Sequence, residues 1–114
     1  MASMNVQTYV HEAELVLAEG TDPASVGAMV TVALCGHWEH EGPCRWPHLN
    51  QIDDARFRTI FVASPEDEPE VRSRIRAALR GQADWRVVSD TARAVAPDEA
   101  EVEARLLQSP RRDP

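Results

Sequence analysis

Residues 34–48 hold most of the side chains in this chain that can carry out chemistry. The segment reads LCGHWEHEGPCRWPH and contains both cysteines, three of the four histidines and two of the three tryptophans. Its thiols and imidazoles follow the pattern C-x-H-x2-H-x3-C-x3-H, with the residues Cys35, His37, His40, Cys44 and His48. Structural zinc sites take four thiolate or imidazole ligands in a tetrahedron. The segment therefore predicts a metal site.

The ligand types narrow the choice of metal ion. Thiolate and imidazole suit zinc, copper or nickel, whereas magnesium and calcium require oxygen ligands. Zinc is the expected ion because it needs no redox tuning. The preferred ligands are Cys35, His37, Cys44 and one of His40 or His48. In zinc-finger signatures the ligand pairs flank a longer finger, so this prediction rests on ligand density and not on a known motif.

An enzyme is an alternative hypothesis for the same segment. With three protein ligands and one water, the metal site would be open, and Glu39 or Glu41 would act as a general base. A histidine next to Cys35 or Cys44 would instead activate a nucleophilic thiol. The order H-x-E-H lacks the i, i+4 histidine spacing of metalloproteases, and the chain contains no nucleotide fingerprint, phosphate loop or serine elbow.

Interpretations without a metal also remain open. Cys35 and Cys44 are nine residues apart, so they would be either packed thiols or the two halves of a disulfide. Trp38 and Trp46 would then anchor the loop on the domain. Aromatic residues also anchor interfaces, which gives a further hypothesis. In it, the protein is a binding or regulatory module that forms a homodimer through an open sheet face or through the tryptophan loop.

Composition and charge exclude several classes of partner. The formal net charge of −7 argues against a nucleic-acid backbone, because phosphate binding needs a basic face. The most apolar segment, residues 26–35, is far shorter than the roughly 20 residues of a membrane span. No signal peptide is recognised, so we expect a cytoplasmic protein with reduced thiols. All basic residues are arginine, which indicates a GC-rich bacterial genome.

The hydrophobic pattern of the first half predicts strands. Residues 6–19 alternate, with Tyr9 and Leu15 on the apolar side, as in a half-buried strand. His11 lies on that side and is expected to be either a histidine at the edge of the core with a hydrogen-bond partner or an extra metal ligand. Residues 28–37 read as a second strand, which would place Cys35 and His37 on one side about 7 Å apart. Residues 39–54 are expected to form a loop, and residues 56–63 a third strand.

Helical signals dominate the second half. Ser64 and Pro65 are suited to start a helix that ends at Gly81, with a buried apolar stripe and a solvated face that carries several arginines. Residues 85–95 alternate as a fourth strand. A second helix begins at Pro97, and its apolar side is predicted to contain Val102, Leu106 and Leu107.

These elements predict an α+β fold. The expected architecture is one sheet of about four strands, formed by an antiparallel meander and a strand–helix–strand unit, with two helices packed on one face. The domain is expected to span residues 4–108, with a frayed tail over residues 109–114. Residues 1–3 are interpreted as a cloning remnant. The uncovered face of such a sheet would suit a homodimer.

Overall fold

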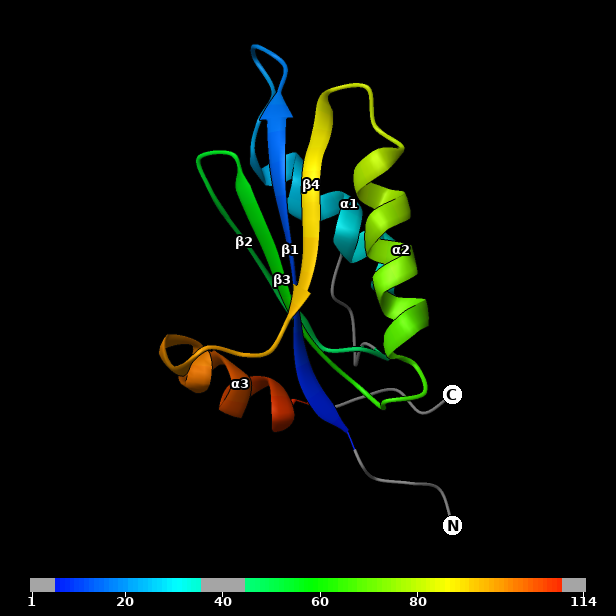
Figure 1. The fold of residues 1–114 in the computed structure, drawn as a ribbon, viewed down its shortest axis with the longest axis vertical. Coiled ribbons are helices and arrows are strands. Elements are labelled where there is room, and N and C mark those ends of the chain that lie inside the picture. Colours follow the sequence, from blue (N-terminus) through cyan, green and yellow to red (C-terminus); the bar gives the residue numbers. More distant parts are fainter. Residues whose placement is uncertain (1–5, 36–44, 110–114) are drawn as a thin grey trace.

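The computed structural model describes residues 6–35 and 45–109 of the chain. Four strands form one antiparallel sheet in the order β2-β3-β1-β4 (Figure 1). In chain order the elements are β1 (Gln7–Leu17), α1 (Ala24–Cys35), β2 (His48–Asp53), β3 (Arg56–Ala63), α2 (Glu68–Arg80), β4 (Trp85–Arg93), a 3-10 turn (Pro97–Glu99) and α3 (Ala100–Leu107).

The predicted α+β class and the single four-stranded sheet are confirmed. The strand–helix–strand unit is formed by β3, α2 and β4, whose two strands run in the same direction with β1 between them. The meander is wrong. The segment between β1 and β3 supplies a helix and an edge strand, and β1 pairs directly with β3.

The strand predicted over residues 28–37 is also wrong, because residues 24–35 form helix α1. Asp22 starts this helix, since its Oδ1 atom accepts a hydrogen bond from the backbone N–H of Ala24 at 3.0 Å. The side chains of Val26, Val30 and Leu34 recur at intervals of four residues and are buried against the sheet. This helical spacing outweighs the β propensity of the valines.

The loop predicted over residues 39–54 contains β2 instead, while residues 36–44 lie outside the described part of the chain. β2 pairs with β3 along its whole length, from His48 opposite Phe61 to Asp53 opposite Arg56. The hairpin turn places Asp54 at φ 56°, a left-handed conformation that aspartate tolerates. Cross-strand pairing therefore makes a strand of a sequence with little apolar alternation.

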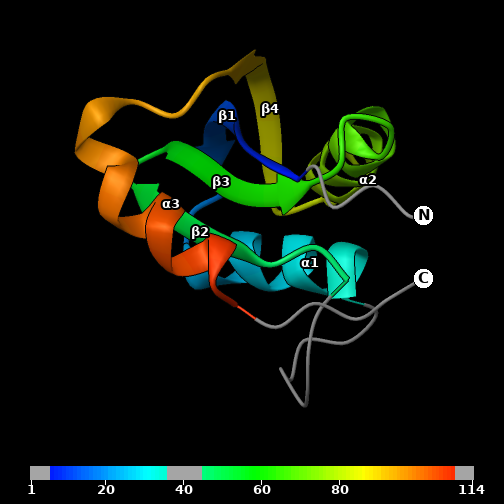
Figure 2. The same cartoon turned by 90° about the horizontal axis from the view of Figure 1, so that it is seen from below.

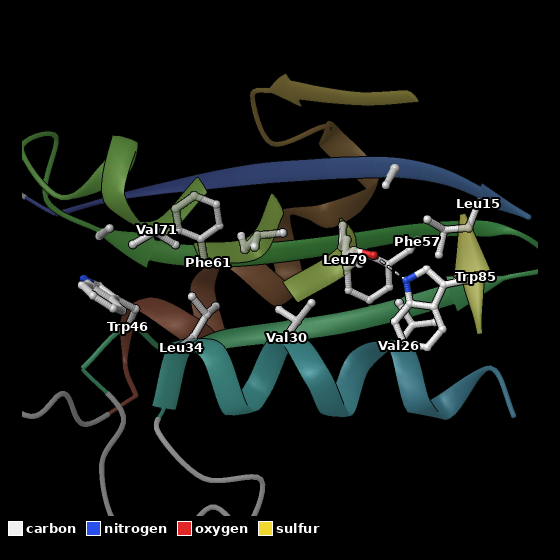
Figure 3. Packing of buried hydrophobic residues seen from close by; sticks show 13 residues of the cluster. Leu15, Val26, Val30, Leu34, Trp46, Phe57, Phe61, Val71, Leu79 and Trp85 are labelled. Carbon is white, nitrogen blue, oxygen red and sulfur yellow. Dashed lines mark hydrogen bonds between the residues drawn. The ribbon is translucent and has the colours of Figure 1, made fainter. Parts of the chain in front are cut away.

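The main core lies between one face of the sheet and the two helices α1 and α2 (Figure 2). In Figure 3 the helix α1 directs Val26, Val30 and Leu34 toward the sheet. Trp46 closes one end of this core and Trp85 the other, and Trp85 donates its Nε1–H to the carbonyl oxygen of Leu79 at 2.8 Å. The core therefore fixes the position of α1, which carries Cys35.

Helix α3 covers part of the opposite face of the sheet. Its Leu106 packs against Val10, Ile60 and Val62 in a second, smaller core. The two helices on one face are thus α1 and α2, and the predicted partner helix from Pro97 onward lies on the other side. Leu107, which was expected on the apolar side, is 42% exposed. None of the helices in the described residues is long and apolar enough to cross a membrane.

Candidate functional site

Two of the five predicted metal ligands lie in the described residues, and the fold brings them together. The Sγ atom of Cys35 lies 4.0 Å from Nδ1 of His48. Cys35 is the last residue of α1, and His48 is the first residue of β2. His37, His40 and Cys44 lie outside the described residues, in the segment that joins these two positions. The segment is therefore flanked by a cysteine sulfur and an imidazole that lie close together.

The approach of α1 to β2 depends on a glycine. A Cβ atom at Gly27 would lie 3.2 Å from Cβ of Asn50, closer than ordinary packing distance. The amide of Asn50 donates hydrogen bonds to the carbonyl oxygen of Gly27 at 2.9 Å and to Oγ1 of Thr31 at 3.1 Å. These contacts hold the helix against the edge strand and set the position of His48 beside it.

The imidazole of His48 belongs to a chain of hydrogen bonds between α1 and the sheet. Its Nε2 atom lies 3.1 Å from Oγ1 of Thr31, and its Nδ1 atom lies 3.0 Å from the carbonyl oxygen of Trp46. Beyond Thr31, the amide of Asn50 accepts a hydrogen bond from the buried hydroxyl of Thr59 at 2.8 Å. The imidazole is therefore held at both nitrogens.

The hydrogen-bond partners of His48 constrain where its ring can carry a proton. A carbonyl oxygen only accepts, so the contact with Trp46 requires a hydrogen on Nδ1 of His48. The Nε2 atom then accepts from the Thr31 hydroxyl. A threonine hydroxyl can donate or accept, so the same pair of atoms also suits the opposite tautomer, with the proton on Nε2.

Cys35 is buried and forms a disulfide bond in this structure. The sequence contains one other cysteine, Cys44, which lies outside the described residues. A disulfide sulfur carries no thiolate charge, so Cys35 can act as a metal ligand only after reduction. Of the non-metal interpretations, the structure supports the disulfide.

Trp46 anchors the chain just before β2, as the packing interpretation predicted. Its indole is 2% exposed and donates Nε1–H to Oδ2 of Asp67 at 3.2 Å. The guanidinium groups of Arg45 and Arg74 lie 4.7 and 5.0 Å from the ring centroid, which are cation–π distances. Trp38 lies outside the described residues.

An open groove runs beside His48, between α1 and β2. Its volume is about 410 Å³, within the range of small-ligand sites. The polar residues that line it are Thr31, His48, Asn50 and Gln51, and apolar residues such as Ile52 and Phe57 complete it. The groove gives ions and small molecules a path from solvent to the imidazole.

A second polar cluster, which sequence patterns did not reveal, lies around His11. This histidine is fully buried, with Nε2 3.2 Å from Oδ2 of Asp90 and Nδ1 3.0 Å from Nη1 of Arg72. Burial lowers the pKa of His11, and the hydrogen bond and negative charge of Asp90 offset only part of that effect. The structure thus supports the core-histidine interpretation.

Arg72 shows where the predicted solvated face of α2 was wrong. It is 7% exposed and donates to the carbonyl oxygen of Val10 and to Glu68, at 2.9 and 2.8 Å. Arg74, Arg76 and Arg80 are about half exposed, as predicted for that face. Arg74 pairs with Glu70 one turn earlier, whereas Arg76 and Arg80 pair with Asp90 of β4. Helical spacing places Arg72 next to the apolar stripe. Its side chain can be buried there because β1 supplies hydrogen-bond acceptors for the guanidinium.

A third cluster joins α3 to the sheet through Glu99. This carboxylate is 1% exposed and pairs with Arg58 and Arg93. It also accepts a hydrogen bond from the backbone N–H of Ala96 at 2.9 Å. The hydrogen bonds from Arg93 lower the pKa of Glu99 to about 2 even though burial opposes this shift. The cluster is a structural one, since every named group is engaged within the fold.

Among the described residues, no three His, Cys, Asp or Glu side chains are grouped closely enough to hold a metal ion by themselves. Any metal at the Cys35–His48 pair would need further ligands from outside the described residues. Comparison of the chain with protein-family models, with curated proteins and with solved structures finds no match. The geometry and chemistry of the site are therefore the basis of the functional proposal.

Proposed function

We propose that this protein binds a metal ion, with zinc preferred, through Cys35, His48 and ligands from the segment between them. The single observation that carries the proposal is the separation of 4.0 Å between Sγ of Cys35 and Nδ1 of His48. In a tetrahedral zinc site, sulfur lies about 2.3 Å and nitrogen about 2.0 Å from the ion, so two such ligand atoms are about 3.6 Å apart. The observed pair is close to that separation.

The surroundings of His48 suit a ligand histidine. A metal-bound imidazole usually donates its other N–H to a fixed acceptor, which sets the ring orientation. With Nδ1 directed to the metal, Nε2–H would donate to Oγ1 of Thr31, 3.1 Å away. Asn50 holds Thr31 in place through its own hydrogen bond. The groove beside His48 supplies the entry path that a metal site requires.

The remaining predicted ligands are close in sequence to this pair. His37 follows Cys35 by two residues, and Cys44 precedes His48 by four. Chain length therefore allows Cys44 and either His37 or His40 to complete a four-ligand set. Copper and nickel suit the same ligands, so the metal is to be identified by measurement. Thiolate ligands require a reducing compartment, and we place the protein in the cytoplasm on that ground.

Metal analysis of the reduced protein tests the proposal. The protein is purified without an affinity metal, reduced with a phosphine, exposed to excess zinc, copper or nickel, desalted and subjected to elemental analysis. We expect about one zinc ion per chain. Competition with a chromophoric chelator then gives the affinity, and His48→Gln is expected to lower it at least tenfold. Cys35→Ser is expected to abolish stoichiometric binding.

The exposed carboxylate Glu101 on α3 supplies a matched control, since Glu101→Gln changes one charge away from the site. Its zinc affinity should equal that of the wild type. Circular dichroism and thermal unfolding of each variant separate loss of binding from loss of fold. Reduced wild-type protein that retains none of the three metals, or that binds zinc equally well after Cys35→Ser, would refute the proposal.

A further inference from the structure

We infer that the outer edge of β2 and the groove beside it bind an extended peptide segment of another protein. The segment carries an apolar residue and a basic residue at the end that lies next to the β2–β3 turn. β2 is an edge strand, because the sheet order is β2-β3-β1-β4. An edge strand leaves main-chain N–H and C=O groups unpaired on one side and can add a further strand there. Such binding needs no metal ion, so it is independent of the proposed function.

Of the two edges of the sheet, the one formed by β2 is suited to strand addition. The other edge strand, β4, pairs with β1 through a register shift beside Glu14 and Leu15. Irregularities of this kind discourage pairing with a further strand. β2 pairs with β3 without a shift, from His48 to Asp53. Its outer edge therefore presents a regular row of main-chain groups.

Alternate residues of β2 direct these groups away from the sheet. The carbonyl oxygen of Pro47 accepts a hydrogen bond from the N–H of Val62 at 2.9 Å. Bonded and non-bonded pairs alternate in an antiparallel ladder, so every second residue after Pro47 also bonds to β3. The residues between them, whose main chain points outward, are His48, Asn50 and Ile52. Within the described residues, the main-chain groups of Asn50 and Ile52 have no hydrogen-bond partner. An extended peptide matches such a row, since it offers a donor and an acceptor at every second residue.

The groove described beside His48 runs along this edge. Every residue from 48 to 52 lines it, so side chains from both faces of β2 border it. α1 forms the other wall, alongside β2 (Figure 3). The residues that α1 contributes there include the small ones Ala24, Gly27 and Ala28. Their size leaves the volume of about 410 Å³ open for a ligand.

A second hollow continues the groove at the β2–β3 turn. Its volume is about 730 Å³, and it shares Pro23 and Ile52 with the groove. The other apolar residues that line it are Leu15, Val16, Leu17 and Ala55. Val16 is 48% exposed, so apolar surface is available for a ligand to cover. An apolar side chain of the peptide is expected to occupy this hollow.

The same end of the groove is acidic. Asp54 lines the second hollow, Asp53 is its neighbour in the chain, and Asp22 precedes the shared Pro23. Among the described residues, none of these three carboxylates forms an ion pair. A basic residue of the peptide would compensate their charge. A second copy of the chain is a poorer occupant, because it also carries a formal net charge of −7 and the same acids beside β2.

Amide hydrogen exchange followed by NMR tests the inference in a buffer that contains a metal chelator. An antiparallel added strand has its N-terminus at the β2–β3 turn. The probe is therefore a blocked peptide with the sequence arginine, leucine, threonine, valine, threonine, valine. We expect it to slow exchange at the amides of Asn50 and Ile52. The amide of Gln51 already faces β3 and should exchange at an unchanged rate.

Two further peptides carry N-methyl groups on alternate amides, one on each of the two alternating sets. Only one set can face β2, so only one peptide should lose affinity. That loss should be at least about tenfold, because the outward groups of β2 would be left without partners. Isothermal titration calorimetry measures both affinities.

Variants of the protein test the groove and its charge. Ala28→Phe fills the groove and should lower the affinity at least about tenfold. Its matched control is Val32→Phe on the same helix, at a position that is 36% exposed and does not line the groove. Asp54→Asn keeps a residue that tolerates φ 56° and should weaken binding about two- to fivefold. It should not change the affinity for a peptide with glutamine in place of arginine. Circular dichroism checks the fold of each variant.

The outcomes separate this inference from the proposed function. A peptide that slows exchange at neither Asn50 nor Ile52, or equal affinities of the two N-methylated peptides, would overturn the inference and leave metal binding intact. Sedimentation velocity without peptide checks for self-association. A dimer in which both amides are already protected would overturn the inference and assign the edge to a second copy. Reduced protein that binds no zinc but shows the expected protection would refute the proposed function and support the inference.

Discussion

The sulfur of Cys35, at the end of α1, lies 4.0 Å from Nδ1 of His48, at the start of β2. The two residues are separated by the segment that carries the other predicted ligands, yet the fold joins its ends. Gly27 packs closely on Asn50, and Trp46 is buried in the main core. The positions of Cys35 and His48 are therefore set by contacts that lie outside the segment between them.

Thr31→Val is expected to weaken zinc binding by the reduced protein about 10- to 100-fold, because it removes the hydroxyl that would accept the Nε2–H of His48. Valine has nearly the same shape, so the core should change little. Thr31→Ser keeps the hydroxyl and is the matched control. Chelator competition at fixed pH measures both affinities. Equal affinities for Thr31→Val and wild type would show that Thr31 does not support the ligand.

Sequence patterns identified β1, β3, α2 and β4 because each has either a clear period or strong end signals. They missed α1 because its β-branched residues and its apolar character on every side hide the helical stripe. A signal for the helix is present in Asp22 and Pro23, a cap followed by a residue suited to the first turn.

The site was only partly predictable for a related reason. The density of thiols and imidazoles identifies the candidate ligands, but the approach of Cys35 to His48 depends on how α1 packs on β2. β2 itself has few apolar residues, and only its pairing with β3 makes it a strand. Thr31, Asn50 and Thr59 come from three different elements, so no local pattern could group them.

Arg72→Gln is expected to destabilise the protein by about 3 kcal/mol, because it removes a buried guanidinium that pairs with the partly exposed Glu68 and leaves the carbonyl oxygen of Val10 without this donor. The matched control is Arg74→Gln, one residue pair along the same helix, whose 46% exposed guanidinium pairs with Glu70. That control should cost about 0.2–1 kcal/mol. Urea unfolding at pH 7.5 measures both. Similar losses in the two variants would contradict the distinction.

Glu99→Gln is expected to cost about 3–5 kcal/mol, since it leaves Arg58 and Arg93 facing a neutral group that is 1% exposed. The loss of stability should appear first near Glu99, as faster hydrogen exchange in α3 and in the part of β3 that α3 covers. The pKa of Glu99 is lowered to about 2, so its contribution is present above the ordinary glutamate pKa of about 4.3 and is lost as the pH falls toward 2. Glu101→Gln again serves as the control.

The buried His11 should make stability depend on pH in a less acidic range than Glu99 does. Its pKa is lowered in the fold, so between that value and the unfolded value of about 6.5 the unfolded chain binds more protons. Stability is therefore complete above pH 6.5 and falls as the pH drops below it, with a slope of at most about 1.4 kcal/mol per pH unit. The groups that face the ring are Asp90 from β4 and Arg72 and Arg76 from α2.

Protonation of His11 would place an N–H against the guanidinium of Arg72, which now donates to Nδ1 at 3.0 Å. His11→Gln can still donate to Asp90 and accept from Arg72 but cannot gain a charge in this range. Urea unfolding of both proteins at pH 7.5, 6.5 and 5.5 isolates the effect, since the two proteins share the other three histidines. The wild type should lose more stability than the variant between pH 6.5 and 5.5. Parallel curves would mean that the buried imidazole does not take up a proton on unfolding.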